Sequence, residues 1–269
     1  MSKGRNYKGI EIFRVVAAFL VIAIHTSPLT TYSQTADFIF TRVIARVAVP
    51  FFFMVTGFFV LSKGTDVRRF LKKTAIIYAA SAALYLPINV YAGHLQSWDM
   101  IDLVQQVFFE GTFYHLWYLP AAILGAWLTW KLMRRLSSGA CLAAVAVLYL
   151  LGLLGDSYWG LVENVPVICS VYNALFALMG YTRGGLFFAP IFMWLGAQLR
   201  YAKPRGTGFE IAGLIVSFAL MLAEALNARA QGWQRHDSMY VLLPAVMYFL
   251  FALLSRWKGT VKMPLGSFS

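Results

Sequence analysis

Long apolar runs separated by short polar connections dominate the sequence. A helix needs about 20 apolar residues to cross the hydrocarbon core of a bilayer, and windows of that length identify eight runs. They cover residues 10–29, 43–61, 74–91, 116–130, 140–154, 186–199, 209–226 and 240–254. The pattern predicts an all-α, polytopic transmembrane helix bundle, with one membrane domain at residues 1–256 and a short cytoplasmic tail at 257–269.

A ninth apolar run, 165–180, is ambiguous, and the positions of Lys and Arg decide between its interpretations. Connections on the cytoplasmic side of a membrane are enriched in Lys and Arg. The basic clusters are Lys3, Arg5 and Lys8; Lys63, Arg68, Arg69, Lys72 and Lys73; Lys131, Arg134 and Arg135; Arg200, Lys203 and Arg205; and Arg256, Lys258 and Lys262. All of these basic clusters lie on the same side of the membrane only if the ninth run does not cross it. We therefore expect a re-entrant or interfacial segment on the outer side, with both termini cytoplasmic.

The composition agrees with this membrane assignment. Hydrophobic residues make up 60% of the chain and charged residues 13%, and the mean hydropathy is +0.67, which is more apolar surface than a soluble core can hide. The formal net charge of +12 lies in clusters between apolar runs, so it indicates topology and not a nucleic-acid site. The first run has no small-residue cleavage site after it and is expected to be retained. Cys141 and Cys169 lie far apart in apolar sequence and predict neither a metal site nor a disulfide framework.

Two residues that are costly to place in a membrane lie on the first predicted span. Arg14 and His25 are eleven residues apart, and at about 100° per residue both project from one helix face with about 16 Å of rise between them. An Arg in a span costs on the order of 2.5–3.5 kcal/mol, so we expect it to face the bundle interior or water and to have a partner. Glu11 is within helical reach of it.

Each of the two residues has a second interpretation. Arg14 lies only a few residues into the span, so its side chain could extend to the cytoplasmic interface. His25 could be a structural histidine that is hydrogen-bonded within the bundle. Otherwise His25 is suited to proton transfer, because imidazole has a pKa near neutrality.

Further polar residues stand at the predicted outer ends of the spans. Asp37, Arg42 and Arg46 mark the outer entry of the second span, where they either form solvated ion pairs or line a substrate pathway. His115 and Trp117, in the run HLWYL, enter the fourth span from outside. Aromatic residues at this depth usually form the interfacial belt, and the alternative is that they border the same pathway.

The second span and the connection after it carry two more features. Pro50 and Gly57 bracket the aromatic run in VPFFFMVTGFF, which lets this helix bend and approach a neighbour closely. The segment RRFLKK, with Arg68, Arg69 and Lys72, is either a topology signal or a grip for a phosphate-bearing cytosolic donor. Paired Arg residues suit the second role because guanidinium groups bind phosphate in a bidentate manner.

Several of these features follow one another along the first 120 residues: Glu11-x-x-Arg14, Arg14-x10-His25, the PFFFMVTGF stretch, Arg68-Arg69 and HLWYL. In order and spacing they resemble acyltransferase family 3 of polytopic membrane acyltransferases. Within that family, HLWYLPAAILG, TRGGLFFAPIFMWLG and RHDSMYVLLPAVMYFLF are similar to the membrane half of VanT-type serine racemases of vancomycin-resistance operons. Members of that family usually carry about ten spans, so the resemblance implies that the last pair is missing here.

The resemblance implies transfer of an acyl group, typically acetyl from cytosolic acetyl-CoA, to a hydroxyl of a sugar or other cell-envelope acceptor outside a bacterial cytoplasmic membrane. It implies that His25 is the catalytic base or acyl-handling residue, with Arg14 and Glu11 as motif partners. A general base must lie within hydrogen-bond reach of the hydroxyl that it activates. The sequence has no G-x-S-x-G elbow and no metal cluster, so neither a hydrolase-type nor a zinc mechanism is expected.

The other site residues follow from the same resemblance. Arg68 and Arg69, with Lys72 beside them, match the basic residues proposed to hold the CoA phosphates. Trp117 matches an aromatic position at the outer end of the active pathway. The expected partners are the lipid bilayer, acyl-CoA and an envelope glycan or small hydroxyl acceptor, without nucleic acid.

The VanT-type similarity also supports a second hypothesis. Those proteins continue into a soluble racemase domain with a pyridoxal phosphate lysine, which nothing in this sequence resembles, so no pyridoxal phosphate is expected in this chain. The buried charges would then form a conduit for a small zwitterion such as L-serine, in a transport or accessory module of a racemase system. Buried ionisable groups mark transport paths as readily as catalytic ones.

Overall fold

The structure is a computed structural model that describes residues 7–64, 66–93, 100–112 and 116–257. Every regular element in these ranges is a helix, which confirms the all-α prediction. The α-helices are α1 (Lys8–Thr26), α2 (Gln34–Phe38), α3 (Ala48–Thr56), α4 (Val67–Tyr91), α5 (Met100–Gln105), α6 (Tyr118–Arg135), α7 (Ser138–Leu154), α8 (Pro166–Met179), α9 (Ala189–Leu199), α10 (Thr207–Ala230) and α11 (Leu243–Arg256). Between them lie the π-helical segments η1 (Ile39–Val43), η3 (Gly57–Leu61) and η5 (Gln106–Glu110), and the 3-10 segments η2 (Ile44–Val47) and η6 (Trp159–Leu161).

Each of the eight predicted apolar runs coincides with helical structure. Four helical stretches are long and apolar enough to cross a membrane: Lys8–Thr26, Gln34–Leu61, Val67–Tyr91 and Thr207–Ala230. The helices α7, α8, α9 and α11 are shorter apolar elements. The number of crossings and the side on which the termini lie stay predictions.

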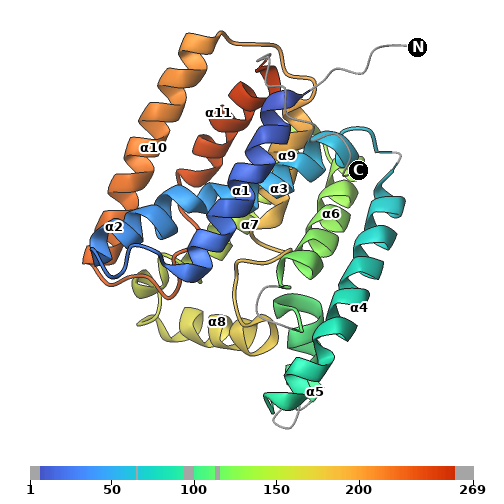
Figure 1. Cartoon of the computed structure of the whole chain (residues 1–269), viewed down its shortest axis with the longest axis vertical. Coiled ribbons are helices and arrows are strands. Elements are labelled where there is room, and N and C mark those ends of the chain that lie inside the picture. Colours follow the sequence, from blue (N-terminus) through green and yellow to red (C-terminus); the bar gives the residue numbers. More distant parts are fainter. Residues whose placement is uncertain (1–6, 65, 94–99, 113–115, 258–269) are drawn as a thin grey trace.

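The ambiguous ninth run forms α8. This helix runs across the lower end of the bundle in Figure 1, whereas α4, α6 and α10 run along its length. Pro166 occupies its first turn, where a missing N–H costs no hydrogen bond, and Gly180 ends it with a positive φ of 67°. This orientation is the one expected of an interfacial or re-entrant segment.

The second predicted span is a continuous but irregular helix that changes type along its length. It passes from α2 through η1 and η2 into α3, and becomes π-helical again at Gly57. Pro50 lies within the first turn of α3, where it interrupts no α-helical hydrogen bond. The bending expected around the aromatic run is therefore distributed over the 3-10 and π segments on either side of it.

The centre of the bundle is α9, which packs against α3, η3, α6, α7 and α11. Most of its side chains are buried, including Phe192 and Met193, which have no exposed surface. Two glycines allow α3 and α9 to cross at close range. A Cβ atom on Gly196 would collide with the backbone carbonyl of Met54, and one on Gly57 would collide with the carbonyl of Met193.

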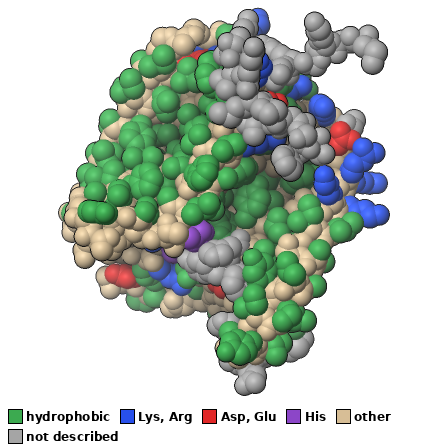
Figure 2. Space-filling model, in the orientation of Figure 1, with side chains coloured by type: hydrophobic (Ala, Val, Ile, Leu, Met, Phe, Trp, Pro, Cys, Tyr) green, Lys and Arg blue, Asp and Glu red, His purple; other side chains and the backbone are tan. Residues whose placement is uncertain are grey.

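The two ends of the bundle differ in their charged residues. We call the end at which α1 begins and α11 ends the upper end, and the opposite end the lower end (Figure 1). Lys and Arg side chains gather at the upper end over the first turns of α4 (Figure 2). Among the described residues, every lysine belongs to the upper end, whereas the lower end carries arginines only: Arg42, Arg46, Arg183, Arg229 and Arg235.

The α3–α9 crossing gives a test of the fold. Gly196→Ala is expected to destabilise the protein by about 1–3 kcal/mol, because the added methyl group must push two helix backbones apart. Thermal unfolding of the purified protein in detergent, followed by circular dichroism, measures this change. Gly139→Ala in α7 is the matched control, because nothing lies within 4 Å of its Cβ position. Equal unfolding midpoints for the two variants would contradict the close crossing.

Candidate functional site

The predicted residues of the first span lie on the exposed side of α1. Glu11, Arg14 and His25 are all exposed, whereas Ile10 and Ala17 are buried on the side of α1 that packs against α11, α3 and η2. The shared face of Arg14 and His25 is therefore confirmed, but the described helices do not enclose it.

Arg14 does not use the partner that helical spacing suggested. It forms no ion pair with Glu11 among the described residues, and its guanidinium carbon lies 6.0 Å from the centroid of the Phe59 ring. Phe59 belongs to η3, which also contacts α4 and α6. The Arg14 side chain thus points from α1 toward the α4–α6 side of the molecule.

The surface on that side is hollowed. Figure 2 shows a depression between the position of α1 and that of the α4–α6 pair. The segment formed by α3 and η3 contacts α1 on one side, α4 and α6 on the other, and so forms the floor. The Arg14 and His25 face of α1 borders this depression.

The basic side chains at the upper end lie on several helices. Arg68, Arg69 and Lys72 are exposed on the first turns of α4, where sequence analysis expects a phosphate-bearing donor. Arg200, at the end of α9, stands over an aromatic cluster, 5.2 Å from the Tyr7 ring and 4.9 Å from that of Phe58.

Arg200 also lies 5.8 Å from the Phe59 ring, so two guanidinium groups from distant parts of the chain, those of Arg14 and Arg200, share one aromatic side chain. The sequence identified Arg200 only as a topology signal. No local motif links it to Arg14, and the link arises from the packing of η3 against α9.

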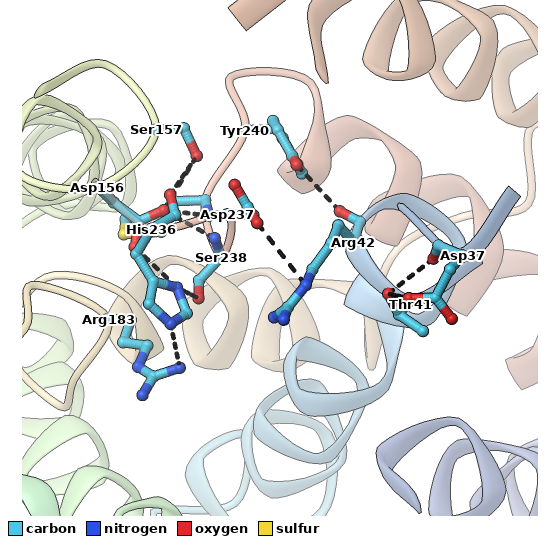
Figure 3. Close-up of polar contacts among 11 residues, drawn as sticks. Asp37, Thr41, Arg42, Asp156, Ser157, Arg183, His236, Asp237, Ser238 and Tyr240 are labelled. Atoms are coloured by element: carbon cyan, nitrogen blue, oxygen red, sulfur yellow. Dashed lines mark hydrogen bonds and ion pairs between the residues drawn. The ribbon is translucent and has the colours of Figure 1, made fainter. Parts of the chain in front are cut away.

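The most extensive polar centre is at the lower end, and its anchor is a carboxylate for which the sequence predicted no site role. Asp156 directly follows α7 and is 1% exposed. Its Oδ1 atom accepts hydrogen bonds from the backbone N–H groups of Ser238 (2.8 Å) and Met239 (2.9 Å) and from the Ser157 hydroxyl (3.0 Å). Figure 3 shows how this Asp156 clamp holds the 235–240 loop.

The clamp also positions His236. Arg183 Nη1 lies 2.9 Å from His236 Nε2, and Ser238 Oγ lies 2.7 Å from Nδ1 (Figure 3). Because a guanidinium group only donates, Nε2 is the acceptor and Nδ1 carries the proton. The guanidinium carbon of Arg183 lies 5.3 Å from the centroid of the Trp117 ring and 4.5 Å from that of Tyr181. The predicted pathway residue Trp117 is thus part of this centre.

Burial determines the charges of the two titratable groups. It raises the pKa of Asp156 to about 6, against the opposing backbone hydrogen bond from Ser238, so the group is a carboxylate at pH 7. Burial and then the positive charge of Arg183 lower the pKa of His236 to about 2. His236 is therefore a neutral hydrogen-bonding group in the folded protein.

The three residues predicted at the outer entry of the second span have different environments. Asp37 is buried and accepts hydrogen bonds from the Leu29 N–H (2.9 Å) and the Thr41 hydroxyl. Arg42 pairs with Asp237 at 3.7 Å. Arg46 is 8% exposed, and its Nε and Nη2 atoms have no hydrogen-bond partner in the described part of the chain. The solvated-loop interpretation is wrong for Asp37 and Arg46, since both are buried.

Some predicted positions remain without a structural account. His115 lies outside the described residues. Within the described ranges, no three His, Cys, Asp or Glu side chains converge closely enough to hold a metal ion. Cys141 is buried and Cys169 half-buried, both as free thiols.

Comparison with known proteins gives matches over almost the whole chain. The profile of an acyltransferase domain family matches residues 7–267. An amino-acid racemase of Enterococcus faecalis is 43% identical over 264 residues, which cover 96% of this chain and 37% of that protein. A second amino-acid racemase of E. faecalis is 38% identical, over 95% of this chain and 38% of that protein. A serine/alanine racemase of Enterococcus gallinarum is 37% identical, over 93% of this chain and 37% of that protein. No solved structure matches.

The Asp156 clamp can be tested by removing its acceptors. Asp156→Ala leaves the two buried backbone N–H groups of Ser238 and Met239 without their acceptor, and is expected to cost about 2–5 kcal/mol of stability. Asp156→Asn keeps one carbonyl oxygen for these donors and is expected to cost less. Thermal unfolding in detergent at pH 7 compares the two variants with the wild-type chain. A midpoint for Asp156→Ala equal to that of Asp156→Asn would argue against the clamp.

Proposed function

The chain belongs to the acyltransferase domain family, and on this premise we propose that it is an integral membrane acyltransferase acting on a cell-envelope acceptor. The donor is an acyl-CoA, such as acetyl-CoA, and the acceptor group is a hydroxyl. The observation that carries the proposal is the arrangement on α1. Arg14 and His25 share an exposed face beside a hollow of the surface, and the basic side chains of α4 stand at its upper end.

His25 is the general base in this proposal. Its imidazole removes the proton from the acceptor hydroxyl as the oxygen attacks the thioester carbonyl carbon. The C–S bond then breaks, the acyl group stays on the acceptor oxygen, and the CoA sulfur leaves as a thiolate that takes up a proton. Imidazole suits this step because its ordinary pKa lies close to the working pH.

The basic side chains of the upper end bind the donor. Arg68 and Arg69 on α4 can each hold a phosphate with two parallel hydrogen bonds, and Lys72, one turn further along, adds a point charge. Arg14 lies on α1 about three turns of helix before His25, on the side of the upper end. It can therefore interact with the donor as the donor extends toward the base. The positive-inside rule favours a cytoplasmic location for this end, where acyl-CoA is made.

A second candidate function follows from the relatives. The chain spans just over a third of the length of the curated relatives that it matches, and those proteins are named as racemases of amino acids. The chain would then be a membrane module that moves an amino acid such as L-serine for a racemase system. In that case the polar residues of the two ends line a transport path and no acyl-CoA is consumed.

His25 distinguishes the two functions. His25→Ala is expected to lower the rate of CoA release from acetyl-CoA by about 10²–10⁴-fold, the usual contribution of a general base. The rate is measured as free thiol in membranes that contain their native envelope acceptors. Thr26→Ala is the control, because Thr26 is an exposed neighbour whose hydroxyl bonds only to the Ile22 carbonyl of its own helix.

The transport hypothesis predicts the opposite pattern. Uptake of labelled L-serine into vesicles would then proceed without acetyl-CoA. CoA release by the wild-type chain would equal the background rate of empty membranes, and His25→Ala would leave that rate unchanged. Acetyl transfer at the wild-type rate in His25→Ala would refute the acyltransferase proposal in its present form.

The arginines of α4 that would bind the donor give a separate prediction. Replacing both Arg68 and Arg69 by Ala is expected to raise the KM for acetyl-CoA roughly tenfold to a hundredfold with little change in kcat, because two charge-assisted contacts to phosphate are lost in ground and transition states alike. The double variant should also lose the preference for acetyl-CoA over acetyl-dephospho-CoA. Arg135→Ala, at the exposed end of α6, is the control for a general loss of positive charge. An unchanged KM would remove these residues from the donor site.

A further inference from the structure

Arg46 is the residue that the fold leaves least explained. It lies in η2 and is 8% exposed. Its Nε and Nη2 atoms are buried without a hydrogen-bond partner in the described ranges. A buried guanidinium group carries a permanent charge, and leaving it unpaired is costly in a low-dielectric site. A buried guanidinium group of this kind is suited to pair with a bound anion.

The carboxylates nearest to Arg46 are already engaged. The Oδ1 atom of Asp156 accepts three hydrogen bonds from the 157 and 238–239 segments. Asp237 pairs with Arg42 at 3.7 Å. These carboxylates therefore interact with Arg46 through space and not by direct hydrogen bonds.

Two other arginines of this region donate to uncharged groups. Arg183 donates to the neutral His236, and Arg235 donates to the Gly180 carbonyl at 3.1 Å. Arg42 is the one of the four in an ion pair, and its side chain extends toward the loop of His236 and Asp237 (Figure 3). Arg42, Arg46, Arg183 and Arg235 are all close enough to His236 to disfavour its protonation. Four positive charges thus lie around His236, whose ring also approaches the Asp156 carboxylate.

The choice of residue type is informative. The described lower end has arginines and no lysine, although lysine serves equally well for topology and solubility. Arginine presents a rigid planar fork that matches carboxylate and phosphate oxygens, and it is less strongly hydrated than lysine. Among the described arginines of this end, only Arg46 is buried. A buried arginine at this position therefore favours recognition of an anion.

We propose that Arg46, flanked by Arg42 and Arg183, binds the oxyanion of a small molecule at the lower end of the bundle. The oxyanion is a carboxylate or a phosphate, both of which accept paired hydrogen bonds from a guanidinium group. Asp156 and His236 are positioning residues, since they fix the loop and hold Arg183. This site stands independently of the acyl transfer on α1, and it suits either an anionic acceptor or an amino-acid cargo.

Ligand binding by the purified full chain in detergent tests the proposal. The probes are acetate and L-alanine for a carboxylate, and inorganic phosphate for the alternative source, with acetamide as the neutral analogue and ionic strength held constant. A saturable rise in unfolding midpoint with acetate or L-alanine supports a carboxylate site, and one with phosphate supports a phosphate site. No response to any of these anions, or an equal response to acetamide, would overturn the proposal.

Variants of Arg46 provide a second readout that does not depend on the choice of probe. Arg46→Met is expected to weaken binding of the responding anion roughly tenfold to a hundredfold. It should also raise the unfolding midpoint of the ligand-free protein, because it removes an unpaired buried charge. Arg229→Gln is the control, since Arg229 lies over Phe38 at 4.3 Å and outside the group around His236. A ligand-free Arg46→Met protein less stable than wild type would show that Arg46 is a structural residue, and would overturn the proposal.

Discussion

The helices α3 and α9 cross so closely that neither Gly57 nor Gly196 has room for a Cβ atom. This contact places α9 at the centre, where it is enclosed by α3, α6, α7 and α11. Within a bilayer, helices gain little from burying apolar side chains against each other, so close backbone packing at small residues is a main source of association. The remaining helices are arranged around this pair, and both polar regions are defined by where α9 begins and ends.

The two polar regions both place arginine side chains against aromatic rings. Arg183 lies shortly before α9 and Arg200 at its end, so one buried helix separates two groups of arginines. At the upper end Arg14 and Arg200 lie against the Phe59 ring. At the lower end Arg183 lies against Trp117 and Tyr181. Aromatic faces stabilise a guanidinium group without neutralising it. Both regions thus contain guanidinium groups that pack on aromatic rings and keep their positive charge.

Much of this organisation can be predicted from the sequence, because it depends on periodicity and composition. Apolar runs located the helices, and helical spacing placed Arg14 and His25 on one face. The Asp156 clamp was not predictable in this way, since its donors lie more than 80 residues further along the chain. Arg183 and His236 are likewise 53 residues apart. Their meeting depends on how the connections at the lower end pack, for which no local pattern exists. The burial of Arg46 was missed for the same reason.

The central claim is that an acyl group passes along the α1 face from a donor at the upper end to an acceptor beyond the membrane. Its most direct test is CoA release by the chain in sealed vesicles of both orientations, with acetyl-CoA added outside and native envelope acceptors present. The account predicts release from inside-out vesicles, and from right-side-out vesicles only after they are opened with detergent. Equal release from sealed vesicles of both orientations, or none from opened vesicles, would contradict it.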